Sequence, residues 1–124
     1  MNNYTKEELK EALQVVSSTI KNCEKIHPKF AEKTSQHTLL KNRIKALYIS
    51  QSLIQNDNTI DKYTKEELEK AIAPVSSVIS KSEKAFLNAR EGTSTHTRLN
   101  KIINAMNISK ALIADEINKR ELLL

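Results

Sequence analysis

The chain has 124 residues, enough for one small domain. Its single glycine and two prolines exclude the glycine-rich phosphate loops of dinucleotide-binding and P-loop folds. Its single cysteine, Cys23, excludes an internal disulfide, and no apolar run is long enough to span a membrane. Twenty basic residues against fifteen acidic ones give a net charge of +5, which is typical of a soluble protein with a slight basic bias; the alternative interpretation is a patch that attracts anions. The first residues lack an apolar signal-peptide core, so we expect a cytoplasmic protein.

The chain consists of two copies of one unit. A shift of 59 residues places residues 4–54 over 63–113 without a gap, and 25 of the 51 aligned positions are identical. We therefore predict two structural repeats, one over residues 1–58 and the other over 59–124. The polar residues 56–59 form the expected linker between them.

Each unit opens with the signals of a helix N-terminus. Thr5 and Glu8 have the spacing of a capping box, and Tyr4 and Leu9 have that of a hydrophobic staple. The second unit repeats all four residues as Tyr63, Thr64, Glu67 and Leu68. Apolar residues at helical spacing predict a first helix of about 25 residues, which Pro28 should kink or end. In the second unit Pro74 lies inside the expected helix and predicts either a kink or a later helix start.

The second helix of each unit is expected to begin at Thr34–Ser35 and at Thr93–Ser94, where either side chain can cap the helix. Gly92 is a suitable left-handed stop for the helix before it. Because the connections are short, the two helices of a unit should be antiparallel neighbours. We predict an all-α protein of two tandem antiparallel helical hairpins that pack face to face in a four-helix bundle-like core. Because a hairpin of this size is marginal alone, further self-association into a homo-oligomer is also expected.

The pattern Thr-Ser-x-His-Thr occurs at both second-helix starts, whereas the loop before it has diverged. The simplest interpretation is a helix cap. The alternative is a phosphate site, because hydroxyls and an imidazole stand beside the exposed N–H groups of a helix N-terminus. Basic residues that follow the pattern would add charge, although they differ between the units. The candidate binding residues are Thr34, Ser35, His37, Thr38, Lys41, Arg43, Thr93, Ser94, His96, Thr97 and Arg98.

The paired tyrosines Tyr4 and Tyr63 also have two interpretations. As staples they need no further role, but a tyrosine at a helix start can also stack on a nucleotide base. We therefore include both among the candidate binding residues.

Catalytic and metal chemistry are not indicated. Three histidines and one cysteine are too few for a zinc cluster, and a metal shared by His37 and His96 is a minor alternative. Cys23 lies on an apolar stripe, which favours a packing role over a nucleophile. No serine has a base at a spacing typical of nucleophilic catalysis. We expect a protein that is not an enzyme and needs no cofactor or metal.

The repeated Tyr-Thr-Lys-Glu-Glu-Leu starts and the repeated Thr-Ser-x-His-Thr segments carry a resemblance to known proteins. In these segments the chain resembles short helical-hairpin proteins of Gram-positive bacteria, phages and prophages. Its size, hairpin layout and hydroxyl-rich helix starts are also similar to the phage nucleotide sponges that counter CBASS and Thoeris immunity. That resemblance implies a small oligomeric helical protein that sequesters cyclic nucleotide signals in the host cytoplasm. It would assign phosphate contacts to the two Thr-Ser-x-His-Thr turns and base stacking to Tyr4 and Tyr63.

Three functions remain open at this point. The first is binding and sequestration of a small phosphate-bearing nucleotide. The second is a protein–protein adaptor or inhibitor that acts on a host protein, which predicts an exposed apolar patch. The third is nucleic-acid binding, which needs a strongly basic face. The acidic residues at the helix starts, such as Glu7 and Glu66, argue against it.

Overall fold

The computed structural model describes residues 3–123. Its four helices are α1 (Lys6–Ile26), α2 (Ser35–Gln55), α3 (Lys65–Asn88) and α4 (Ser94–Leu122), with short 3-10 segments η1 (His27–Lys29) and η2 (Asn58–Lys62). No strand occurs among the described residues, so the predicted all-α class is confirmed. Within the same residues, no helix has the length and apolar character needed to cross a bilayer.

Both predicted capping boxes are present, and they fix where α1 and α3 begin. The Glu8 backbone N–H donates to Thr5 Oγ1 at 3.1 Å, and the Thr5 N–H donates to Glu8 Oε1 at 2.9 Å. Thr64 and Glu67 form the same two bonds at the start of α3. A later start for α3 was therefore the wrong alternative. The helix runs from this cap through Pro74, because the proline removes only one backbone donor from an otherwise intact helix.

The helix ends differ in part from the prediction. Helix α1 has 21 residues and stops at Ile26, because Pro28 lies in the 3-10 turn that follows. Gly92 has a positive φ of 85°, as expected, but it does not end the helix before it. Helix α3 already ends at Asn88, since Ala89 takes an extended conformation, and Gly92 shapes the turn that leads into Thr93. Lys33 takes the equivalent left-handed conformation in the first repeat.

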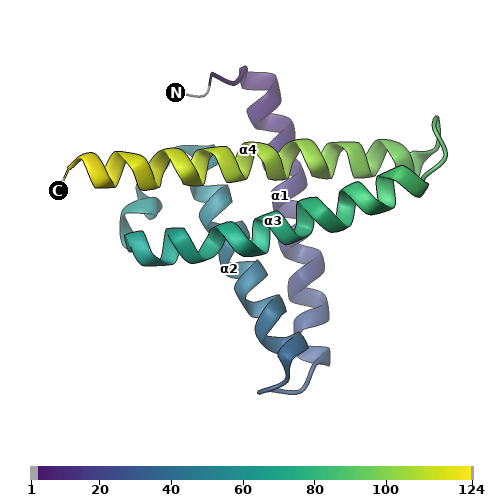
Figure 1. The fold of residues 1–124 in the computed structure, drawn as a ribbon, viewed down its shortest axis with the longest axis horizontal. Helices are drawn as coiled ribbons and strands as arrows, with labels where there is room; N and C mark the ends of the chain where they lie inside the picture. The colour runs from purple at the N-terminus through teal and green to yellow at the C-terminus, as the bar shows by residue number, and fades with distance from the viewer. Residues whose placement is uncertain (1–2, 124) are drawn as a thin grey trace.

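The two hairpins cross one another. Figure 1 shows α1 and α2 as one antiparallel pair lying across the pair formed by α3 and α4. Helix α2 packs on α3, α1 packs on α4, and α2 also contacts α4. Exchanging the repeats converts the α2–α3 contact into the α4–α1 contact, so the packing has an approximate two-fold pattern.

One apolar core joins the four helices. It contains residues from both repeats, often at positions 59 residues apart, which we call repeat mates. Val16 and Val75 are one such pair, and Leu47 and Met106 are another, all with 0–1% of their surface exposed. The expected bundle-like packing of two hairpins is therefore what buries the apolar stripe of each.

The linker is held by the far end of α4. Asn56 ends α2 in a left-handed conformation, and Ser52 Oγ donates to the Asp57 carboxylate at 2.8 Å as the chain turns into η2. Helix α4 continues through Asp115, the repeat mate of Asn56. Further along α4, the Arg120 guanidinium donates hydrogen bonds to the carbonyl oxygens of Tyr63 and Ile60. These bonds tie the segment between the hairpins to the end of the second one.

Candidate functional site

The two Thr-Ser-x-His-Thr turns lie at the free ends of the two hairpins. In Figure 1 the α1–α2 connection and the α3–α4 connection are at separate extremities of the molecule. The turns therefore do not share a cavity, and His37 and His96 are not brought together. No group of three or more metal-binding side chains exists among residues 3–123.

The repeated residues of these turns make helix caps and close the hairpin ends. The His37 N–H donates to Thr34 Oγ1 at 3.2 Å, and the His96 N–H donates to Thr93 Oγ1 at the same distance. The His37 ring stacks on His27, with centroids 4.1 Å apart. These contacts account for the threonine and histidine of the pattern as structural residues.

The second hairpin repeats this arrangement. His96 stacks on Phe86, the repeat mate of His27, with centroids 4.2 Å apart. Thr97 Oγ1 donates to the Thr93 carbonyl at 3.2 Å. The remaining predicted residues near the two turns are exposed: Ser35, Thr38, Lys41, Ser94 and Arg98. A phosphate site at each turn stays a prediction, and of the residues named for it only Arg43 lines a groove.

A groove, groove 1, lies between α2 and α3, where the hairpins cross. Its volume is about 730 Å³. Ala46, Ile49, Ala71 and Pro74 give it an apolar floor. Its full lining is Leu39, Asn42, Arg43, Lys45, Ala46, Ile49, Thr64, Glu66, Glu67, Lys70, Ala71, Ala73, Pro74, Ser77 and Lys81.

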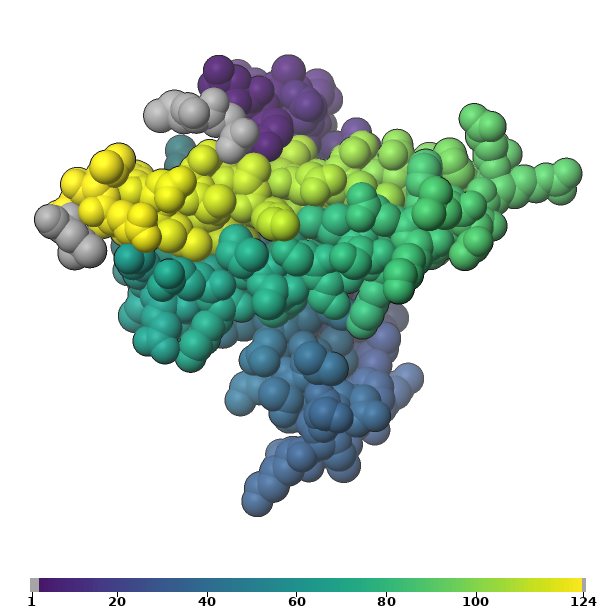
Figure 2. All heavy atoms as spheres, viewed as in Figure 1, coloured from purple at the N-terminus to yellow at the C-terminus, as the bar shows by residue number. Residues whose placement is uncertain are grey.

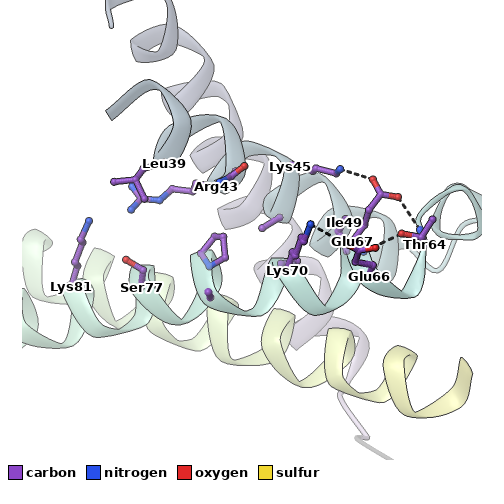
Figure 3. Close-up of a pocket in the computed structure, with 15 residues that line it drawn as sticks. Leu39, Arg43, Lys45, Ile49, Thr64, Glu66, Glu67, Lys70, Ser77 and Lys81 are labelled. Carbon is purple, nitrogen blue, oxygen red and sulfur yellow. Dashed lines mark hydrogen bonds and ion pairs between the residues drawn. The ribbon is translucent and has the colours of Figure 1, made fainter. Parts of the chain in front are cut away.

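The two ends of groove 1 differ in charge. At one end Glu67 pairs with Lys45 and Glu66 with Lys70 (3.0 Å for the second pair), so these charges cancel. The Lys45 ammonium, together with the Thr64 backbone N–H, lowers the pKa of Glu67 to about 2. Figure 3 shows Arg43 and Lys81 together at the other end.

Neither Arg43 nor Lys81 forms an ion pair within residues 3–123. Ser77 lies next to Lys81 on α3 and adds a hydroxyl to this end. This end of the groove therefore has a net positive charge and polar groups free to bind a ligand anion, beside an apolar floor.

A second groove, groove 2, lies between α4 and α1 and is the repeat mate of the first. Its volume is about 350 Å³. Seven of its nine lining residues are repeat mates of groove 1 residues, and four of these have the same side chain in both grooves, namely Glu8, Ala12, Ala105 and Ile108. The lining is Tyr4, Glu8, Glu11, Ala12, Lys101, Asn104, Ala105, Asn107 and Ile108.

The basic residues distinguish the two grooves. In groove 1 they are Arg43, Lys45, Lys70 and Lys81, whose repeat mates are Ile102, Asn104, Glu11 and Asn22. None of these four mates is basic, and groove 2 has one lysine, Lys101, opposite two glutamates. Partial burial and the nearby charges of Asp115 and Glu8 raise the pKa of the Tyr4 hydroxyl. Groove 2 is therefore smaller and more acidic.

Sequence reasoning identified part of this arrangement. Arg43 lines groove 1 and Tyr4 lines groove 2, while Tyr63 packs beside the core at the start of α3, as a staple should. Lys45, Lys70 and Lys81 were missed. Comparing the repeats would have found them, because each is a basic residue in one copy only.

The Cys23 side chain is buried, and that burial raises the pKa of its thiol, which disfavours the nucleophilic thiolate. The large exposed apolar residues are spread over several elements, namely Ile26, Phe30, Leu39, Tyr48, Leu87, Leu122 and Leu123.

No protein-family model, curated protein or solved structure matches this chain.

Proposed function

We propose that this protein binds a small phosphate-bearing nucleotide in groove 1 and sequesters it without chemical change. The observation that carries the proposal is the basic end of the groove, where Arg43 and Lys81 lack ion-pair partners among the described residues. A guanidinium and an ammonium group at the same end of a groove are suited to a phosphate. The apolar floor beside them offers a surface for a base or ribose.

The chemistry of the lining supports binding rather than catalysis. None of the fifteen lining residues is a histidine or a cysteine, and both glutamates are engaged in ion pairs. A carboxylate held by a lysine is a poor general base, since the pKa of Glu67 lies near 2. Because the size, hairpin layout and hydroxyl-rich helix starts of the chain are similar to those of nucleotide sponges, cyclic dinucleotides and related signals are the first ligands to test.

The direct test is isothermal titration calorimetry with a panel of cyclic dinucleotides, linear dinucleotides, AMP and inorganic phosphate. We expect one molecule bound per chain, and the nucleotide should bind more tightly than phosphate alone. The repeat itself supplies the variant, because Arg43→Ile and Lys81→Asn introduce the side chains of the repeat mates Ile102 and Asn22. Losing two charge-assisted contacts should weaken binding by more than about 100-fold.

The matched control is Lys101→Asn, which removes the lysine of groove 2 and introduces its mate's side chain, that of Asn42. This variant should bind the nucleotide as the wild type does. The proposal fails if no nucleotide in the panel binds the folded protein. It also fails if Lys101→Asn and the groove 1 variant weaken binding equally.

A further inference from the structure

The net positive charge of the chain comes from the outer halves of the two hairpins. We define arm 1 as residues 21–45 and arm 2 as residues 80–104, which are repeat mates position by position. Arm 1 has seven basic and two acidic residues, a net charge of +5, and arm 2 has five basic and two acidic residues, a net of +3. The rest of the chain has eight basic and eleven acidic residues, a net of −3.

The basic residues of the arms are available to a partner. Of the twelve, eleven are exposed and only Arg43 is half-buried. Lys45 is the one among them that forms an ion pair within the described residues. Figure 2 shows the two arms projecting from the molecule as separate lobes.

The acidic helix starts do not face the ends of the arms. Glu7 and Glu8 begin α1, and Glu66 and Glu67 begin α3. Figure 1 places these starts at the opposite ends of their helices from the two hairpin tips. Glu67 pairs with Lys45 at the inner end of arm 1, but the fold keeps the acidic helix starts away from the hairpin tips (Figure 1).

The hairpin tips add hydroxyl groups that can donate hydrogen bonds to phosphate oxygens. The first turn of each second helix exposes hydroxyls, with Ser35 and Thr38 on α2 and Ser94 and Thr95 on α4. Serine and threonine hydroxyls beside lysine and arginine are the groups that contact the backbone of nucleic acids. Charge spread over two separate arms suits an extended polyanion better than one small ion.

We propose that arms 1 and 2 bind the phosphate backbone of double-stranded nucleic acid without reading its sequence. Single-strand binding needs exposed aromatic rings on which bases stack. In the arms, Phe86 and the rings of His27, His37 and His96 are already stacked in pairs, and Phe30 is the one other aromatic residue. A duplex backbone requires only the charges and hydroxyls that the arms present.

The test measures fluorescence anisotropy of labelled DNA and RNA duplexes of about 30 base pairs over a series of salt concentrations. The arm variant combines Lys25→Gln, Lys29→Gln, Lys84→Gln and Arg90→Gln, none of which lines groove 1. The control variant combines Lys6→Gln, Lys10→Gln, Lys62→Gln and Lys110→Gln, which are exposed lysines outside the arms. Both variants have the same net charge.

We expect wild-type binding to weaken steeply with salt, because neutralised phosphates release counterions. The arm variant should lose at least about tenfold in affinity and reduce the salt slope by about 3 to 4, whereas the control should change by less than about threefold. DNA and RNA duplexes that bind alike would support backbone recognition. Equal losses in both variants would overturn the proposal, since net charge alone would then explain binding.

Two further outcomes would also overturn it. One is a wild-type protein that does not bind duplexes at low salt. The other is a preference for phosphatidylserine vesicles over duplexes that the arm variant abolishes, which would assign the arms to a lipid surface. Because Arg43 and Lys81 stay intact in both variants, nucleotide binding in groove 1 remains measurable, so failure of either proposal can be distinguished from failure of the other.

Discussion

Groove 1 lies between α2 and α3, and groove 2 lies between α4 and α1. The two grooves occupy equivalent positions in the approximate two-fold arrangement of the repeats. Their walls share small residues at matching places, such as Ala46 and Ala105. Their basic residues do not match, since groove 1 has Arg43 where the repeat has Ile102. The comparison shows that the packing of the hairpins tolerates different side chains along the groove walls, so these positions are free to specialise.

The largest effect should come from transferring the basic residues to groove 2. The variant Ile102→Arg, Asn22→Lys, Glu11→Lys places basic residues at the repeat mates of Arg43, Lys81 and Lys70, of which Glu11 lines groove 2. If charge is what distinguishes the grooves, calorimetry should show two nucleotides bound per chain in place of one. A folded variant that still binds one would show that the smaller volume of groove 2 also excludes the ligand.

The structural equivalence of the two repeats can be tested in the apolar core. Leu47 and Met106 are repeat mates with 0% exposure. Replacing either by alanine should cost about 2–5 kcal/mol in urea unfolding, because each leaves a cavity in a closed core. The exchange Leu47→Met, Met106→Leu should cost less than about 1.5 kcal/mol, since the volumes are similar. Very unequal costs for the two alanine variants would contradict the equivalence of the repeats.

The two capping boxes should differ by a smaller amount in their contribution to stability, and this difference should depend on pH. Lys45 lies beside Glu67, whereas its mate beside Glu8 is Asn104. The pKa of Glu67 falls from 4.5 to about 2 on folding, so its contribution to stability is present above about pH 4.5 and is lost as the pH falls through 2.

The Glu67→Gln variant keeps a side chain that can serve in a capping box and removes the charge. It should therefore unfold at a lower temperature than the wild type at pH 7, and the difference should vanish near pH 2. Glu8→Gln should have a smaller effect at pH 7. Thermal unfolding by circular dichroism at several pH values measures both, and equal effects would deny a role for Lys45.

The smallest effect concerns the turns at the hairpin tips. Lys33 has a φ of 68°, and its repeat mate Gly92 has a φ of 85°. Because a side chain is disfavoured there, Lys33→Gly should stabilise the protein by about 0.5–1 kcal/mol. Gly92→Ala should destabilise it by a similar amount through the backbone alone, since an added Cβ meets no atom within 4 Å. Unfolding in urea measures both, and a destabilising Lys33→Gly would contradict this account.

Local sequence signals predicted the helices well because their causes are local. The capping boxes at Thr5 and Thr64 and the break at Pro28 depend on residues a few positions apart. The surroundings of the candidate site residues depend on contacts that are not local. The Thr-Ser-x-His-Thr pattern was noticed for its polar residues, but the stack of His37 on His27 involves a residue ten positions away, across a turn. Periodicity within one helix contains no information on that contact.

The sequence by itself determined the number of helices, most of their boundaries and the division into two repeats, because caps, prolines and apolar periodicity act over a few residues. Only the tertiary structure decided which charges share a surface. Arg43 and Lys81 are 38 residues apart on different hairpins, and they line one groove because the hairpins cross at α2 and α3. That crossing is set by how two apolar faces fit together, which no single helix specifies.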